Sequence, residues 1–139
     1  MKVEAIHIGR EKAGLLSPVD SVQAVAGKGL EGDRKFKESG AKPGQALTLV
    51  EAEEVERVGL GEGDTRRQLT VRGVRLNDLV GKHFKVGDVE CYGVELCEPC
   101  EHLESMTRPG IIKDLVHRAG LNADILTDGT IAVGDALEI

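Results

Sequence analysis

The 139-residue chain has few aromatic side chains, with two Phe, one Tyr and no Trp. Its hydrophobic core must therefore be built mainly from Val, Leu, Ile and Ala. Apolar runs of the roughly 18 residues that a membrane-spanning helix needs do not occur. The N-terminal stretch MKVEAIHIGR alternates apolar and polar residues, unlike the apolar segment of a signal peptide. These features predict a cytoplasmic protein that has no membrane partner.

The chain also has no excess of positive charge. Twenty-four acidic residues against 18 basic ones give a net charge of −6, and the acidic residues are spread along the sequence. This balance opposes a general affinity for phosphate backbones, so we do not expect nucleic acid as a partner. The length fits one domain over residues 1–139, large enough to bury about two thirds of the surface of the unfolded chain.

Cysteine is scarce, and the three thiols lie close together in the sequence at Cys91, Cys97 and Cys100. An odd number of cysteines without an export signal argues against a disulfide framework and for reduced thiols. Cys97 and Cys100 have CxxC spacing, but the chain lacks the second CxxC or paired histidines of a four-ligand zinc site. A redox CxxC usually follows the first strand of a βαβ unit, and this one comes late. A zinc-binding or thiol-redox module therefore remains an alternative.

The three cysteines differ in their surroundings. Cys91 lies inside an apolar run, where a small buried side chain is the commoner role. Cys100 follows Pro99 and precedes a short segment with helical character. Backbone N–H groups at such a strand-to-helix junction stabilise a thiolate, so Cys100 is predicted to be the most reactive thiol, with a lowered pKa.

Period-two alternation, bounded by Gly or Pro, predicts strands at residues 2–8, 19–25, 46–50 and 68–72. Gly-Asp pairs between apolar stretches predict two hairpins, at residues 83–96 and 129–139.

Residues 51–58 and 109–118 have helical signals, and the second segment has an apolar face that we expect to pack on the sheet. Many short strands with few helices predict a mostly β fold. The specific expectation is a closed antiparallel β-barrel with two or three short peripheral helices.

Two clusters combine basic residues with glycine or with a strand. GKGLEGDR, residues 27–34, contains three glycines and two cations, and Arg66, Arg67 and Arg72 lie in or beside the predicted strand at 68–72. Arginine binds phosphate or carboxylate in a bidentate manner. Taken separately, however, the two clusters are better explained as a turn with solvated charges and as an exposed strand face.

Five separated segments, considered together, resemble a known family. They are GLEGDR at 29–34, RRQLTVRGV at 66–74, LVGK with FKVG at 79–87, CEPC with Leu103 at 97–103, and GLNADIL with GTIAVGD at 120–135. In this order they resemble a stand-alone MOSC domain, the C-terminal domain of molybdenum cofactor sulfurases. The resemblance implies a β-barrel and an essential cysteine, matched here by Cys100 beside Pro99.

In such relatives the cysteine is proposed either to carry sulfur as a persulfide or to coordinate the molybdenum of a bound molybdopterin cofactor. The resemblance makes Cys100 the candidate catalytic residue and molybdenum ligand, with Cys97 as a possible second ligand. The candidate cofactor-binding residues are Gly32, Asp33, Arg34, Arg67, Thr70 and Arg72.

The resemblance leaves two function classes open. One is a reductase module that binds molybdenum cofactor and receives electrons from a redox partner protein. The other is a sulfur carrier that is loaded by a cysteine desulfurase and passes its sulfur to a metal–sulfur centre. Pyridoxal phosphate is not expected to bind this chain alone, because the domain that binds it in the larger eukaryotic sulfurases is missing from the sequence.

Overall fold

The computed structural model describes residues 1–10, 16–61 and 63–139. Its larger sheet is formed by eight strands, which are β1 (Lys2–Ile8), β2 (Ser17–Val19), β5 (Leu47–Glu51), β6 (Leu69–Arg72), β7 (His83–Val86), β8 (Val89–Leu96), β9 (Leu121–Ile125) and β11 (Leu137–Glu138). Their order across the sheet is β11-β7-β8-β9-β5-β6-β1-β2. A smaller sheet, in the order β10-β3-β4, contains β3 (Ser21–Val25), β4 (Gly29–Leu30) and β10 (Gly129–Ala132).

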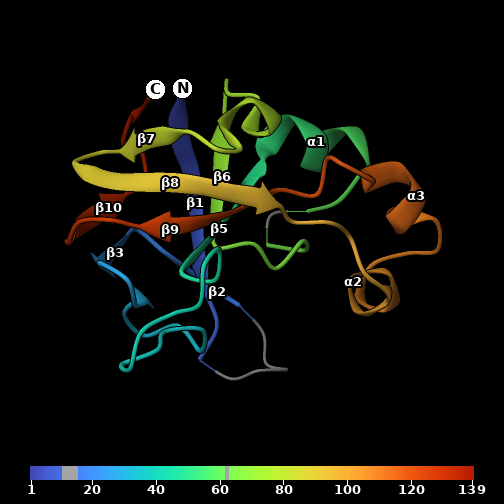
Figure 1. Ribbon diagram of the computed structural model, residues 1–139. Coiled ribbons are helices and arrows are strands. Elements are labelled where there is room, and N and C mark those ends of the chain that lie inside the picture. The colour runs from blue at the N-terminus through green and yellow to red at the C-terminus, as the bar shows by residue number, and fades with distance from the viewer. Residues whose placement is uncertain (11–15, 62) are drawn as a thin grey trace.

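Three short α-helices lie together on one side of the molecule (Figure 1). They are α1 (Ala52–Arg57), α2 (Glu101–Met106) and α3 (Ile111–Leu115), and a 3-10 turn, η1, spans Leu76–Leu79. Glu53 and Glu54 lie in the first turn of α1, where negative charge favours the helix dipole. None of the helices in the described residues is long and apolar enough to cross a membrane.

The larger sheet curls strongly but stays open, so the predicted closed barrel is wrong in that respect. Near the chain ends the curl almost closes, because Val3 N–H donates to Asp135 O over 2.8 Å and Gly134 N–H donates to Val3 O over 2.8 Å. Strand β11, however, has two residues and pairs with β7, while β2 pairs with β1. Across the described residues, β11 and β2 form no hydrogen-bonded ladder with each other. The strands are mostly antiparallel, as predicted, but β5 and β6 run parallel.

The hairpin predicted at residues 83–96 is confirmed, with β7 and β8 joined through Gly87 and Asp88. The hairpin predicted at 129–139 is wrong, because β10 pairs with β3 in the smaller sheet whereas β11 pairs with β7 in the larger one. The strand predicted at 19–25 is also divided, since β2 ends at Val19 and β3 begins at Ser21 in the other sheet. In both places the chain crosses between sheets, an event that local alternation does not reveal.

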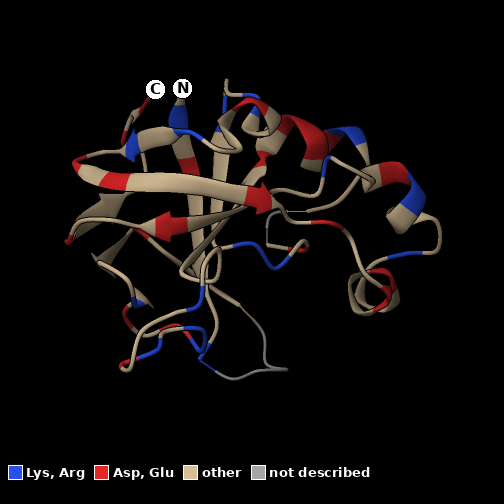
Figure 2. Cartoon of the chain, viewed as in Figure 1, with Lys and Arg blue, Asp and Glu red and all other residues tan. Residues whose placement is uncertain are grey.

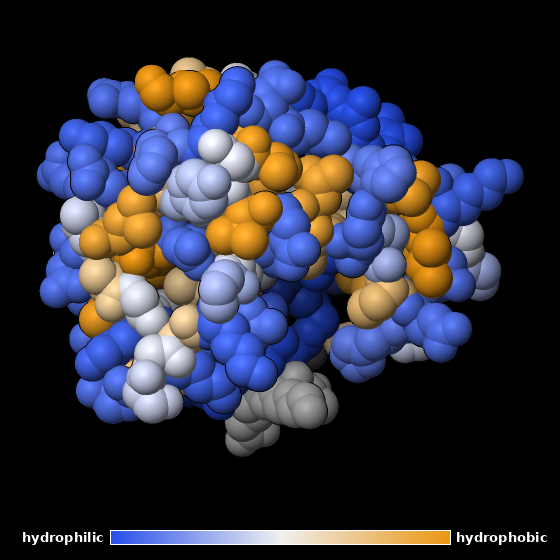
Figure 3. Space-filling model, in the orientation of Figure 1, coloured by the Kyte–Doolittle hydropathy of each residue, from blue (hydrophilic) through white to orange (hydrophobic). Residues whose placement is uncertain are grey.

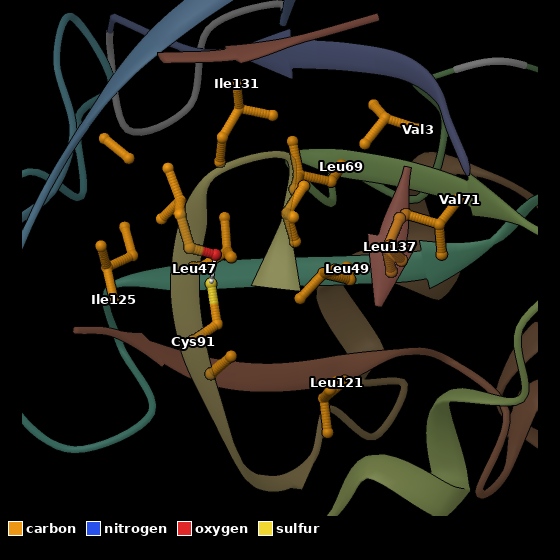
Figure 4. Packing of buried hydrophobic residues seen from close by; sticks show 14 of the residues in the cluster. Val3, Leu47, Leu49, Leu69, Val71, Cys91, Leu121, Ile125, Ile131 and Leu137 are labelled. Carbon is orange, nitrogen blue, oxygen red and sulfur yellow. Dashed lines mark hydrogen bonds between the residues drawn. The ribbon is translucent and has the colours of Figure 1, made fainter. Parts of the chain in front are cut away.

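Aliphatic side chains from both sheets fill the space inside the curl (Figure 4). Leu47, Leu49 and Leu69 are completely buried on the larger sheet, and Ile131 of β10 reaches the same cluster from the smaller sheet. The smaller sheet thus covers the core that the open sheet would otherwise expose. Cys91 lies in this core, as its sequence context predicted.

A second, smaller cluster lies among the helices. Leu103 of α2 packs with Ile111 and Leu115 of α3 and with Val58, which follows α1. Helix α3 therefore packs mainly on other helical segments, and the expectation that its apolar face would lie on the sheet is not met. Val116, assigned to that face, is exposed. The segment between Cys97 and α3 is held in place by this helical cluster, through Leu103 of α2.

Candidate functional site

A pocket of about 520 Å³ opens next to the residue that follows β8. The space-filling view shows a hollow with a hydrophilic surface on this side of the molecule (Figure 3). The walls come from the segment after β4, from strands β5 and β9, and from the start of the Cys97–Cys100 segment. The lining residues are Arg34, Lys35, Lys37, Gly44, Gln45, Thr48, Cys97 and Asn122.

The pocket is cationic although the chain is acidic overall. Burial is the largest cause that lowers the pKa of Lys35, and the neighbouring charges of Arg34 and Arg67 lower it further. Two basic segments that are far apart in the sequence therefore meet here. Figure 2 shows Lys and Arg in blue, both in the lower loops of this view and in the loop between α1 and β6. Over the described ranges, no carboxylate forms an ion pair with Arg34, Lys35 or Arg67.

Asp33 fixes the turn that presents these cations. Its buried carboxylate accepts hydrogen bonds from Gly9 N–H over 2.8 Å, from Lys35 N–H over 3.0 Å and from Gln68 Nε2 over 2.8 Å. Gly32, directly before it, has φ +85°, a backbone conformation that residues with a side chain rarely adopt. Both residues were predicted to bind a cofactor. In the structure they hold the backbone that places Arg34 and Lys35 at the pocket.

The same network supports the pocket wall on β5. The side-chain oxygen of Gln68 accepts a hydrogen bond from Thr48 N–H over 2.9 Å, and Gln68 N–H donates to Thr48 Oγ1 over 3.0 Å. Thr48 lines the pocket, so a continuous chain of buried hydrogen bonds runs from Asp33 through Gln68 to the wall. Buried networks in which each member is satisfied make a site rigid.

The thiols occupy three different environments. Cys97 is half-buried and lines the pocket, and its N–H donates to Gly120 O over 2.8 Å. Cys100 is exposed and occupies the N-cap position of α2 without a side-chain capping hydrogen bond, which confirms the predicted junction, but it is outside the pocket lining. Cys91 is buried, and burial raises its pKa to about 12. The structure therefore places Cys97, not Cys100, on the pocket wall.

The predicted arginines separate into two groups. Arg34 lines the pocket, and Arg67 lies next to Lys35 with its Nε donating to Ala119 O over 3.0 Å. Arg72 instead pairs with Glu4 and Glu56, and its hydrogen bonds to these carboxylates raise its pKa. Thr70 is buried, and neither Thr70 nor Arg72 lines the pocket.

Sequence reasoning missed six lining residues. A signal existed for Lys35 and Lys37, because they continue the basic run RKFK directly after Asp33. The other four have no local signal, since they reach the pocket only through the pairing of β5 with β9 and the loop before β5; they are Gly44, Gln45, Thr48 and Asn122. For the zinc alternative, the described residues contain no group of three or more His, Cys, Asp or Glu side chains that could hold a metal ion.

Comparison with known proteins matches the chain to one family. The model of the MOSC domain matches residues 4–138. No curated protein matches the chain.

Solved structures with the same fold include the YuaD protein of Bacillus subtilis, with TM-score 0.82 and 17% identity, covering 99% of this chain and 93% of that one. YiiM of Geobacillus stearothermophilus aligns with TM-score 0.75 and 19% identity, over 99% of this chain and 73% of that one. YiiM of Escherichia coli aligns with TM-score 0.68 and 16% identity, over 99% of this chain and 69% of that one. At these identities the structures establish the fold.

Proposed function

Because the chain belongs to the MOSC domain family, which is associated with molybdenum cofactor chemistry, we propose that it binds a molybdopterin-type cofactor in the pocket between Arg34 and Cys97. The observation that carries this proposal is the meeting of Arg34, Lys35 and Arg67 beside a pocket-lining thiol. The charges of Arg34 and Arg67 both lower the pKa of Lys35, and within the described part of the chain no carboxylate forms an ion pair with these cations. A phosphate-bearing ligand would relieve this repulsion.

The residues present fit such a cofactor in size and chemistry. The volume of about 520 Å³ lies in the usual range for small-molecule sites. Arg34, Lys35 and Lys37 would hold the phosphate, and Gln45 and Asn122 offer amide groups for the polar edges of a pterin. In this arrangement the phosphate end of the cofactor would contact the cations, and its pterin end would contact the amide groups.

The thiol of Cys97 would face the metal, because thiolate is a soft ligand suited to thiophilic metals. When bound, the cofactor supplies the redox chemistry of its metal, and the protein supplies binding and orientation. The thiolate is the form of cysteine that binds metal. Half-burial of Cys97 limits the access of water to that sulfur.

The first test is a titration of pterin binding, followed by fluorescence, for Arg34→Ala and Arg72→Ala. Loss of a charge-assisted contact costs about 1.5–3 kcal/mol, or roughly ten- to hundredfold in affinity. We expect that loss for Arg34→Ala alone. Arg72→Ala is the matched control, since it removes an arginine that is paired with Glu4 and Glu56 away from the pocket. Equal effects of the two substitutions would refute the pocket assignment.

The second test assigns the thiol. Molybdenum content and pterin retention are measured for Cys97→Ser and Cys100→Ser purified from a molybdenum-replete host. The pocket geometry predicts that Cys97→Ser loses molybdenum and that Cys100→Ser keeps it. The family resemblance gives the role to Cys100, so the reverse result would transfer the ligand to Cys100 while leaving the cationic pocket in place.

A second candidate function, sulfur carriage, is supported by the exposure of Cys100. Its thiolate would attack the outer sulfur of a persulfide on a cysteine desulfurase, and the donor cysteine would leave as a thiolate. Incubation with such an enzyme and cysteine should then add ~32 Da to the intact mass. The adduct should persist in Arg34→Ala and disappear in Cys100→Ser. Absence of the adduct in the wild-type protein would eliminate this candidate.

A further inference from the structure

One carboxylate joins the segment between the two neighbouring thiols to a distant turn. Glu98 lies directly after Cys97, and its Oε1 accepts a hydrogen bond from His117 N–H over 2.7 Å. Its Oε2 lies 2.6 Å from His117 Nδ1. Both oxygens therefore contact the same residue, which fixes the direction of the Glu98 side chain as well as its distance.

His117 has an unusual backbone conformation that this contact supports. Its φ is 59°, in the left-handed region that residues other than Gly seldom occupy. Asn77 Nδ2 donates to His117 O over 3.0 Å, so hydrogen bonds hold the residue at both its N–H and its carbonyl. A strained residue held from both sides is expected where the geometry has a use.

Residues 117–120 also form hydrogen bonds to Cys97, which lines the pocket, and to Arg67, which lies beside Lys35. Gly120 O accepts the Cys97 N–H over 2.8 Å, and Ala119 O accepts the Arg67 Nε over 3.0 Å. Residues 117–120 thus hold the backbone of Cys97 and the side chain of Glu98. They also hold Arg67, the cation next to Lys35.

We propose that Glu98 and His117 are positioning residues, which form a clamp that keeps the Cys97 thiol at the pocket wall while Cys100 stays exposed. The use of this position rests on the proposed function, but the position itself can be measured on the protein without any cofactor. Without the clamp, Cys97 would keep one backbone hydrogen bond, and the segment up to α2 would open more often. The direct consequence is greater access of solvent to Cys97.

The experiment measures the rate of iodoacetamide labelling at each cysteine, with tandem mass spectrometry to locate the adducts. Both partners of the clamp are partly exposed, so in Glu98→Ala we expect Cys97 to be labelled about two- to fivefold faster. Cys100, already exposed, should change by less than about twofold. Buried Cys91 reports global unfolding and should stay unlabelled.

Three further variants make the result specific. Glu95→Ala removes an exposed glutamate near the end of β8, the strand that precedes Cys97, and should leave all three rates unchanged. Glu98→Gln keeps an oxygen that accepts the His117 N–H and should restore most of the protection of Cys97. His117→Asn tolerates the left-handed conformation and keeps the backbone N–H, so it should cause a smaller increase than Glu98→Ala.

A Cys97 rate in Glu98→Ala equal to that in Glu95→Ala would overturn the clamp. If Glu98→Ala also exposes Cys91, the clamp is tested with His117→Asn instead. An increase in the labelling rate of Cys97 alone in that variant supports the clamp, and no increase overturns it. Pterin titration of the same variants separates the two proposals. A changed Cys97 rate in a protein that never binds pterin refutes the proposed function and leaves the clamp standing.

Discussion

The side-chain amide of Gln68 donates a hydrogen bond to the buried Asp33 carboxylate over 2.8 Å. This bond joins the turn after β4 to the residue directly before β6, 35 positions further along the chain. Because Arg34 and Lys35 follow Asp33, the bond also sets where two of the pocket's cations lie. The buried polar network therefore supports the pocket, although Asp33 and Gln68 do not line it.

Asp33→Ala should destabilise the protein strongly. The substitution removes an acceptor of three hydrogen bonds and leaves the Gln68 amide buried without that partner. We expect a loss of about 3 kcal/mol in the free energy of unfolding, measured by urea denaturation. Glu31→Ala, which removes an exposed carboxylate from the same turn, is the control and should have little effect. A loss below about 1 kcal/mol for Asp33→Ala would show that the network is not structurally important.

Gly120→Ala should be far more damaging than alanine at another glycine with positive φ. A Cβ at Gly120 would lie 2.2 Å from Leu49 O, whereas a Cβ at Gly81 would meet no atom within 4 Å. Gly81→Ala should cost about 1 kcal/mol through its backbone conformation, and Gly120→Ala about 3 kcal/mol or more, because β5 must move. Thermal unfolding of both variants measures the difference. Equal melting temperatures would contradict the close packing of the 117–120 turn on β5.

Cys91 should make stability depend on alkaline pH. Burial raises its pKa from 9.0 to about 12, so above pH 9 the unfolded chain releases a proton that the folded protein keeps. The contribution of the protonated Cys91 thiol to the free energy of unfolding is complete below pH 9. It is lost as the pH rises toward 12, by at most about 1.4 kcal/mol per pH unit. Cys91→Val lacks this titration, so its unfolding free energy should fall less steeply over the same interval. Parallel profiles of unfolding free energy against pH for the two proteins would contradict this prediction.

Lys35→Met should stabilise the free protein slightly and weaken its interaction with anions. Removing one of the crowded cations relieves repulsion from Arg34 and Arg67, worth about 0.5 kcal/mol. Inorganic phosphate should raise the melting temperature of the wild-type protein, compared with chloride at equal ionic strength, because a ligand of the folded state stabilises it. The rise should shrink in Lys35→Met and persist in Lys82→Met, which changes an exposed lysine outside the pocket. An identical phosphate effect in all three proteins would mean that Lys35 does not bind phosphate.

Local sequence patterns determined several of the strands, the helical segments near α1 and α3, and the burial of Cys91. Alternation identified β1, β5 and β6 almost to their ends, and the apolar stretches around Gly87 and Asp88 identified the β7–β8 hairpin. These features depend on residues close together in the chain, so their signals are present in the sequence itself. Five segments in a fixed order were also enough to indicate the MOSC family, which the family model then matched over residues 4–138.

The assembly of the site was decided by tertiary structure. Arg72 and Arg67 lie five positions apart, yet one pairs with Glu4 and Glu56 while the other reaches Lys35. The open edge of the larger sheet and the separation of β10 from β11 likewise depend on which strands pair across long distances. Such pairing follows from packing of the whole chain, in which each long-range contact must offset its loop-closure entropy. The sequence alone therefore indicated which kinds of residue could bind an anion and a soft metal. Only the fold brought the predicted residues Arg34 and Cys97 to one pocket with Lys35, which the sequence analysis had not singled out.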